Sequence, residues 1–82
     1  MPQSAEQVLQ QEYLLARAKI LELAATLDRI QRAEGQVEQH PQMQLLQKGF
    51  QILTSDSRDR AEQVQLLFSR QYASDWRKTF GV

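Results

Sequence analysis

The first part of the chain carries apolar residues at the spacing expected for one face of an α-helix. Ser4 and Gln7 form a capping-box pattern at its start, and neither Pro nor Gly follows until Gly35. The pattern predicts a helix over residues 4–34, roughly 46 Å long at 1.5 Å per residue. The apolar residues recur at alternating intervals of four and three, as in a coiled coil, at Leu9, Tyr13, Ala16, Ile20, Leu23, Leu27 and Ile30.

The apolar face of this predicted helix is broader than a two-stranded coiled coil requires. Leu14 and Leu21 lie to one side of the stripe, and Ala18 and Ala25 lie beside them. A helix that contacts two or more neighbours needs such a wide apolar face. We therefore expect this helix to pack in a bundle.

A second helix is predicted over residues 41–53. Pro41 suits the first turn of a helix, where its missing N–H is not needed. Apolar residues then repeat at intervals of three and four from Met43 to Leu53. Gly49 interrupts this pattern, and we expect it either to allow close packing against the first helix or simply to weaken its own helix.

A third helix is predicted over residues 57–72, after a short run of cap-forming residues. Asp59 and Glu62 offer a second capping pair near its start. The sequence leaves open whether the tail, residues 73–82, packs on the body of the protein or is free to bind. The elements together predict an all-α fold, a small three-helix bundle that forms one domain over residues 1–82.

The predicted helices differ in length, which suggests that a second chain completes the fold. The two later helices would be roughly 20 and 24 Å long, too short to cover the first helix. A second copy related by a two-fold axis could cover the remainder, so we predict a homodimer, with another protein as a possible partner. An up-down-up bundle and a long hairpin are both compatible with the pattern. The predicted hydrophobic interface comprises Leu9, Tyr13, Leu14, Ala16, Ile20 and Leu21.

Composition narrows the possible functions. The chain has 82 residues, no cysteine and a formal net charge of zero. No disulfide can therefore stabilise the fold, and no strong electrostatic attraction to nucleic acid or an anionic membrane is expected. The first residues lack the pattern of a signal peptide, and no apolar run approaches the roughly 20 residues that span a bilayer. We expect no membrane association and a cytoplasmic location.

Catalytic and metal-binding patterns are weak. His40 is the only histidine, and Glu38 does not stand at the spacing of a helical metal motif. The serines are better interpreted as helix caps, and the isolated glycines form no phosphate-binding loop. We therefore predict no enzymatic activity, no catalytic residues, no metal, no cofactor and no small-molecule ligand.

Nucleic-acid binding is the alternative function. Residues 43–72 could form a helix-turn-helix-like segment with basic residues near its second helix. Neighbouring acidic residues neutralise much of this charge, so we expect nucleic-acid binding less than protein interaction. The basic residues of this alternative are Arg58, Arg60, Arg70 and Lys78. The favoured function is a small helical interaction or structural module.

Overall fold

The computed structural model describes residues 3–69, which are helical apart from short connections. Helix α1 spans Ala5–Arg32 and helix α2 spans Pro41–Leu53. A third helical segment covers residues 60–69 and continues up to the limit of the described residues. The predicted all-α fold is confirmed, and no strand occurs within residues 3–69. The predicted end of the third helix and the tail lie outside the described residues.

The chain divides into two compact units, Met1–Gln36 and Val37–Val82. The first unit contains α1, and the second contains α2 and the helix over residues 60–69. The prediction that residues 1–82 form one domain stays a prediction. None of the described helices is both long enough and apolar enough to cross a membrane.

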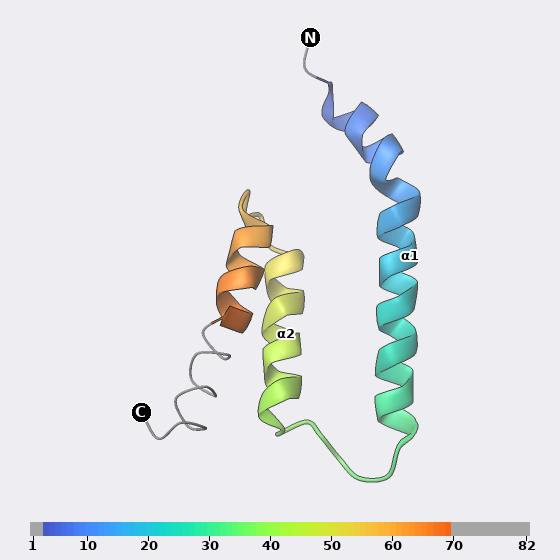
Figure 1. The fold of residues 1–82 in the computed structure, drawn as a ribbon, viewed down its shortest axis with the longest axis vertical. Helices are drawn as coiled ribbons and strands as arrows, with labels where there is room; N and C mark the ends of the chain where they lie inside the picture. The colour runs from blue at the N-terminus through green and yellow to red at the C-terminus, as the bar shows by residue number, and fades with distance from the viewer. Residues whose placement is uncertain (1–2, 70–82) are drawn as a thin grey trace. The chain divides into compact units, whose positions relative to one another are not determined.

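Helix α1 begins with the predicted capping box. The Gln7 N–H donates to Ser4 Oγ at 3.2 Å, and the Ser4 N–H donates to Gln7 Oε1 at 2.9 Å. The helix then runs without a break to Arg32 (Figure 1). It ends two residues earlier than predicted, because Ala33 is extended and serves as the C-cap. Gly35 was predicted to be the C′ residue and adopts a φ of +102°, which glycine tolerates well. With Ala33 as the C-cap, however, it lies one position beyond C′.

Helix α2 has the predicted bounds, and its N-cap is His40. The imidazole Nδ1 of His40 accepts a hydrogen bond from the Gln42 N–H at 3.1 Å. Pro41 occupies the first helical position, where no backbone donor is required. His40 is therefore a structural residue that satisfies the positive end of α2.

The third helix begins three residues later than predicted. Residues 54–59 form an irregular connection instead. Ser55 Oγ donates to the Ile52 carbonyl at 2.7 Å and accepts from the Ser57 N–H at 3.3 Å. The Ser55 hydroxyl thus satisfies backbone groups that a continuing helix would otherwise pair, which explains the delayed start of the third helix. The carbonyl of Asp59 accepts the first helical bond, from the Gln63 N–H at 3.0 Å.

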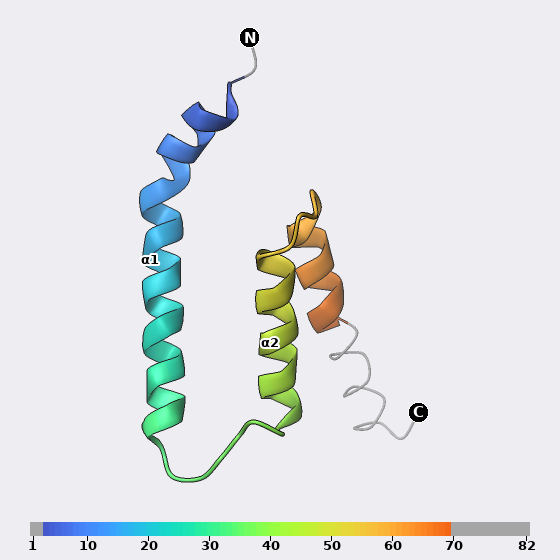
Figure 2. The same ribbon diagram turned by 180° about the vertical axis from the view of Figure 1, so that it is seen from behind.

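Helix α2 and the helix over residues 60–69 form an antiparallel hairpin (Figures 1 and 2). They approach closely at Gly49, the one buried residue within residues 3–69. A β-carbon at Gly49 would lie 3.8 Å from Cε2 and Cζ of Phe68. Gly49 therefore has a ring of the third helix as its neighbour within the second unit, and its packing against the first helix stays a prediction. Half-buried apolar residues accompany this contact, namely Met43, Leu45, Leu46, Phe50, Ile52, Val64 and Leu67.

Candidate interaction surface

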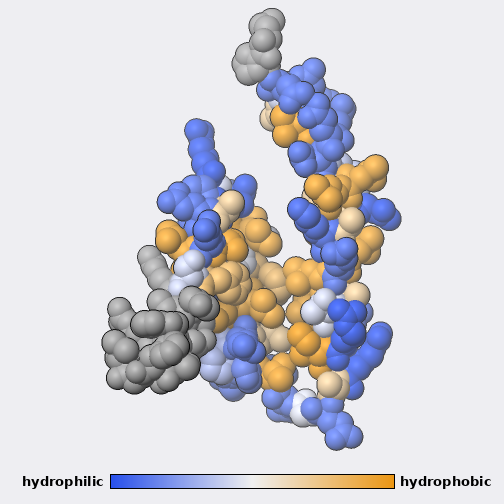
Figure 3. All heavy atoms as spheres, in the orientation of Figure 1, coloured by the Kyte–Doolittle hydropathy of each residue, from blue (hydrophilic) through white to orange (hydrophobic). Residues whose placement is uncertain are grey.

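The N-terminal half of α1 exposes large apolar side chains along several turns. Leu14 is 71% exposed, Ile20 68% and Leu9 63%, although each has the size and polarity of a core residue. Figure 3 shows apolar side chains of α1, in orange, at the surface among polar ones. No side chain is buried in a hydrophobic core within residues 3–69. Large apolar side chains exposed in such number on one helix mark an interaction site more often than a solvent-facing surface.

All six residues of the predicted interface lie on this surface. Each is exposed, including the small side chain of Ala16. Val8 and Leu15 are also exposed and were not part of the predicted interface. They stand seven residues apart at position c of the heptad, on the side of α1 away from the a and d stripe. That repeat is the sequence signal that could have identified them. We call the six residues of the predicted interface the α1 apolar surface, comprising Leu9, Tyr13, Leu14, Ala16, Ile20 and Leu21.

The C-terminal half of α1 is less exposed along the same stripe. Leu23, Leu27 and Ile30 are intermediate in exposure. Thr26 lies within this half, where its hydroxyl donates to the Glu22 carbonyl at 3.0 Å and accepts from an Arg29 guanidinium nitrogen at 2.9 Å. These bonds are local to the helix. The α1 apolar surface differs from the rest of the stripe in its greater exposure.

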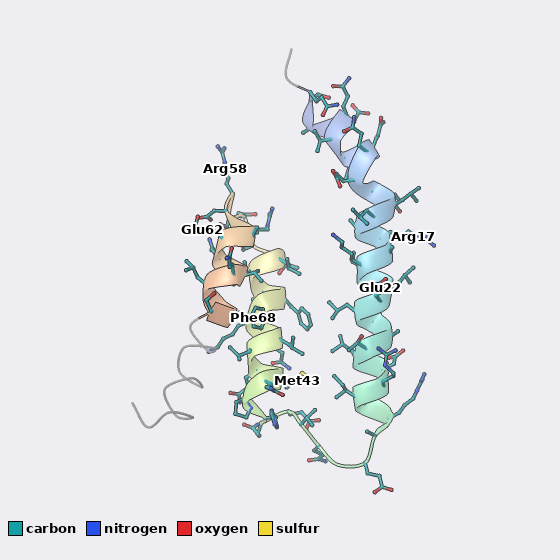
Figure 4. The ribbon with its side chains drawn as sticks, viewed as in Figure 1. Arg17, Glu22, Met43, Arg58, Glu62 and Phe68 are labelled. Carbon is teal, nitrogen blue, oxygen red and sulfur yellow. The ribbon has the colours of Figure 1, made fainter. Side chains whose placement is uncertain are left out.

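Charged side chains border the stripe at defined heptad positions. If Leu9 and Ala16 occupy position d and Tyr13 occupies position a, then Glu12 falls at position g. By the same numbering Arg17 falls at position e and Lys19 at position g. Arg17 projects outward from α1 in Figure 4. Positions e and g flank the seam of a coiled coil, where charges influence partner choice and orientation.

The connection between α2 and the third helix holds a polar cluster. The Ser57 hydroxyl donates to Asp59 Oδ1, and the Gln63 amide donates to the same oxygen at 2.7 Å. The hydrogen bond from Ser57, followed by that from Gln63, lowers the pKa of the Asp59 carboxyl from its ordinary value. Glu62 was the predicted partner of Asp59, but Gln63 provides the contact. The cluster serves as a helix cap, since its bonds close on the start of the third helix.

The basic residues of the alternative function are only partly described. Arg58 lies in this connection and Arg60 begins the third helix, and Arg58 projects away from the hairpin in Figure 4. The guanidinium of Arg60 donates to the Ser55 carbonyl through Nε, at 3.1 Å, and through a terminal nitrogen. Arg60 therefore has a structural contact within the connection. Arg70 and Lys78 lie outside the described residues.

Residues suited to metal binding are dispersed in the part of the chain that the structure describes. No group of three or more His, Asp or Glu side chains gathers there in a way that could hold a metal ion. His40 is exposed and caps α2 through Nδ1.

Comparison with known proteins adds no relative. No protein-family model, no curated protein and no solved structure matches this chain.

Proposed function

We propose that this chain is a small helical interaction module that forms a homodimer through the α1 apolar surface and has no enzymatic activity. The observation that carries this proposal is the exposure of that surface. Its large apolar side chains range from 56% exposed at Tyr13 and Leu21 to 71% exposed at Leu14, within a helix that buries no side chain. Covering them would provide the hydrophobic stabilisation that α1 lacks by itself.

Energetics support a partner for α1. Most of the stability of a protein helix comes from packing its apolar face, and not from intrinsic helix propensity. Full burial of one leucine or isoleucine side chain contributes about 1.5–3 kcal/mol. Leu9, Leu14, Ile20 and Leu21 are each more than half exposed, so their partial burial would contribute several such increments.

A second copy of the chain is the partner that we favour. It presents the same surface, and a two-fold axis lets each apolar residue of one copy serve the other. The surface also carries both signs of charge at its borders, through Glu12, Arg17 and Lys19. Acidic residues of one copy can therefore pair with basic residues of the other, which a surface with one sign of charge would not allow.

Sedimentation equilibrium of the full chain tests this proposal. A dimer mass at tens of micromolar is expected, together with a melting temperature that rises with protein concentration. Ile20→Lys should shift the mass towards the monomer, because it places a charge within the apolar surface. Gln11→Lys is the matched control, since its position f faces away from the stripe, and it should remain dimeric. A monomer mass for the unchanged chain would refute the proposal.

Nucleic-acid binding remains the alternative function, and the described hairpin gives it less support. Classical helix-turn-helix motifs cross their helices at about 90–120°, whereas α2 and the third helix run antiparallel. The two functions differ in a simple measurement. A nucleic-acid-binding protein would bind heparin or duplex DNA with steep salt dependence, and Arg58→Ala would weaken that binding.

A further inference from the structure

We infer that the two copies associate through antiparallel α1 helices, with Tyr13 of each copy packed against the partner's Ala16. This inference rests on the proposed homodimer and specifies its geometry. It concerns the exposed half of the stripe, from Leu9 to Ile20, because the residues from Leu23 onward are less exposed. The unbroken heptad spacing of that half provides the seam.

Side-chain sizes favour the antiparallel orientation. A parallel, in-register pair would place each a or d residue beside its own copy. Tyr13 would then meet the partner's Tyr13, and Ala16 would meet the partner's Ala16, which crowds one layer and leaves a gap in the next. An antiparallel pair joins position a to position d, so that Tyr13 meets the partner's Ala16. Facing large and small residues fill a core without voids.

The same register pairs the other apolar residues of the a and d stripe, Leu9 and Ile20, while Leu14 and Leu21 at position b lie beside the seam. When Tyr13 faces the partner's Ala16, Leu9 faces the partner's Ile20 at the next layer in each direction. Each pair occurs twice by symmetry, so the seam has four layers that span the exposed half of the stripe. The two layers of Leu9 and Ile20 join large side chains, and the two layers of Tyr13 and Ala16 join a large side chain to a small one.

An antiparallel register shifted by one heptad brings Glu12 against its own copy in one direction. In the other direction it brings Arg17 and Lys19 against their own copies. Both shifts oppose like charges.

Charges along the seam are complementary in this register. The g positions face each other in an antiparallel pair, so Glu12 lies beside the partner's Lys19, and the contact occurs twice by symmetry. Arg17 faces the partner's Gln10, which is neutral. A parallel pair would gain an equivalent contact between Glu12 and the partner's Arg17. It would also place Glu6, at position a, beside the partner's Glu6, where two carboxylates repel.

Two charge-reversal variants distinguish the orientations. Lys19→Glu should raise the dimer Kd roughly tenfold if the helices are antiparallel, because two attractive contacts become repulsive. Arg17→Glu is the matched control and should change the Kd little. The parallel orientation predicts the reverse result for both variants. Mixing Glu12→Lys with Lys19→Glu should restore association, since each seam contact again joins opposite charges.

A distance measurement on the full chain gives an independent test. The chain has no cysteine, so Arg32→Cys provides one spin-labelling site at an outward position. The inferred register offsets the two labels by 35 residues, or about 52 Å along the axis at 1.5 Å per residue. Double electron–electron resonance should therefore give a separation of that order. A separation below about 30 Å, set by interaxial distances near 10 Å plus the label arms, would overturn the antiparallel inference while leaving the homodimer intact. A monomer mass without an intermolecular signal would overturn both.

Discussion

Phe68 packs its ring against Gly49 across the hairpin of the second unit, with Cε2 and Cζ each 3.8 Å from where a β-carbon at Gly49 would lie. That separation is an ordinary van der Waals distance, so a methyl group would touch the ring without displacing it. The glycine is therefore compatible with close packing but is not sterically required. This contact connects α2 to the third helix at the one buried position of the described chain.

Gly49→Ala is expected to stabilise the protein. Alanine is favoured over glycine in a helix interior by about 1 kcal/mol, and the added methyl group would gain contact with Phe68. Thermal unfolding followed by circular dichroism should show a higher melting temperature. Gly35→Ala is the informative comparison, because its φ of +102° is strained for alanine, and it should lower stability. A destabilised Gly49→Ala would mean that the hairpin is tighter than described.

Ser4→Ala is expected to destabilise α1 by about 1 kcal/mol, since it removes the acceptor for the Gln7 N–H and breaks the capping box. Far-ultraviolet circular dichroism at fixed protein concentration should show reduced helicity or a lower melting temperature. Ser4→Asp keeps an acceptor at the cap and should retain wild-type behaviour. Equal melting of the alanine variant and the wild type would show that the cap does not limit the stability of α1.

Acid should weaken the cap of the third helix through Asp59. Ser57 and Gln63 donate to the Asp59 carboxylate, which lowers its pKa in the folded chain below the ordinary 3.8. The folded state therefore binds fewer protons than the unfolded state between these two pKa values. The stabilisation is fully present above the unfolded pKa and is lost as the pH falls through the lower folded value.

The measurement compares wild type with Asp59→Asn from about pH 5 to about pH 2, the interval in which paired carboxylates become protonated. Helicity or melting temperature of the wild type should fall more steeply than that of Asp59→Asn, which cannot titrate at this position. The other carboxyl groups are common to both proteins, so they cancel in the comparison. Identical pH profiles would indicate that Asp59 does not stabilise the helix start.

The local signals in the sequence predicted α2 and the start of α1 well. Ser4 and Gln7 specify their cap by direct contact, and Pro41 fixes the beginning of α2. The imidazole cap from His40 was missed, although a proline at the first helical position already marks the preceding residue as the N-cap. The end of α1 was predicted two residues too late. Gly35 was expected to follow the last residue of the helix directly, whereas its positive φ belongs to the connection after the C-cap.

The remaining differences arise from competing local caps and from contacts between residues far apart in the sequence. The start of the third helix depends on how Ser55 and Ser57 distribute their hydroxyl hydrogen bonds, and several cap-forming residues compete there. The neighbour of Gly49 depends on which helix packs against it, which periodicity alone does not determine. The residues of the α1 apolar surface are exposed, and their role as an interface stays a prediction. The molecule that covers this surface cannot be deduced from apolar spacing, because its identity depends on a second chain.

The exposed leucines of α1 also bear on the fate of the chain in a cell. Leu9, Leu14 and Leu21 present the kind of apolar segment that chaperones and proteases bind in incompletely assembled proteins. We expect a copy without a partner to be degraded faster than an assembled one. The steady-state amount of this protein would then follow the supply of partners, so that α1 would act as a quality-control signal as well as a contact surface.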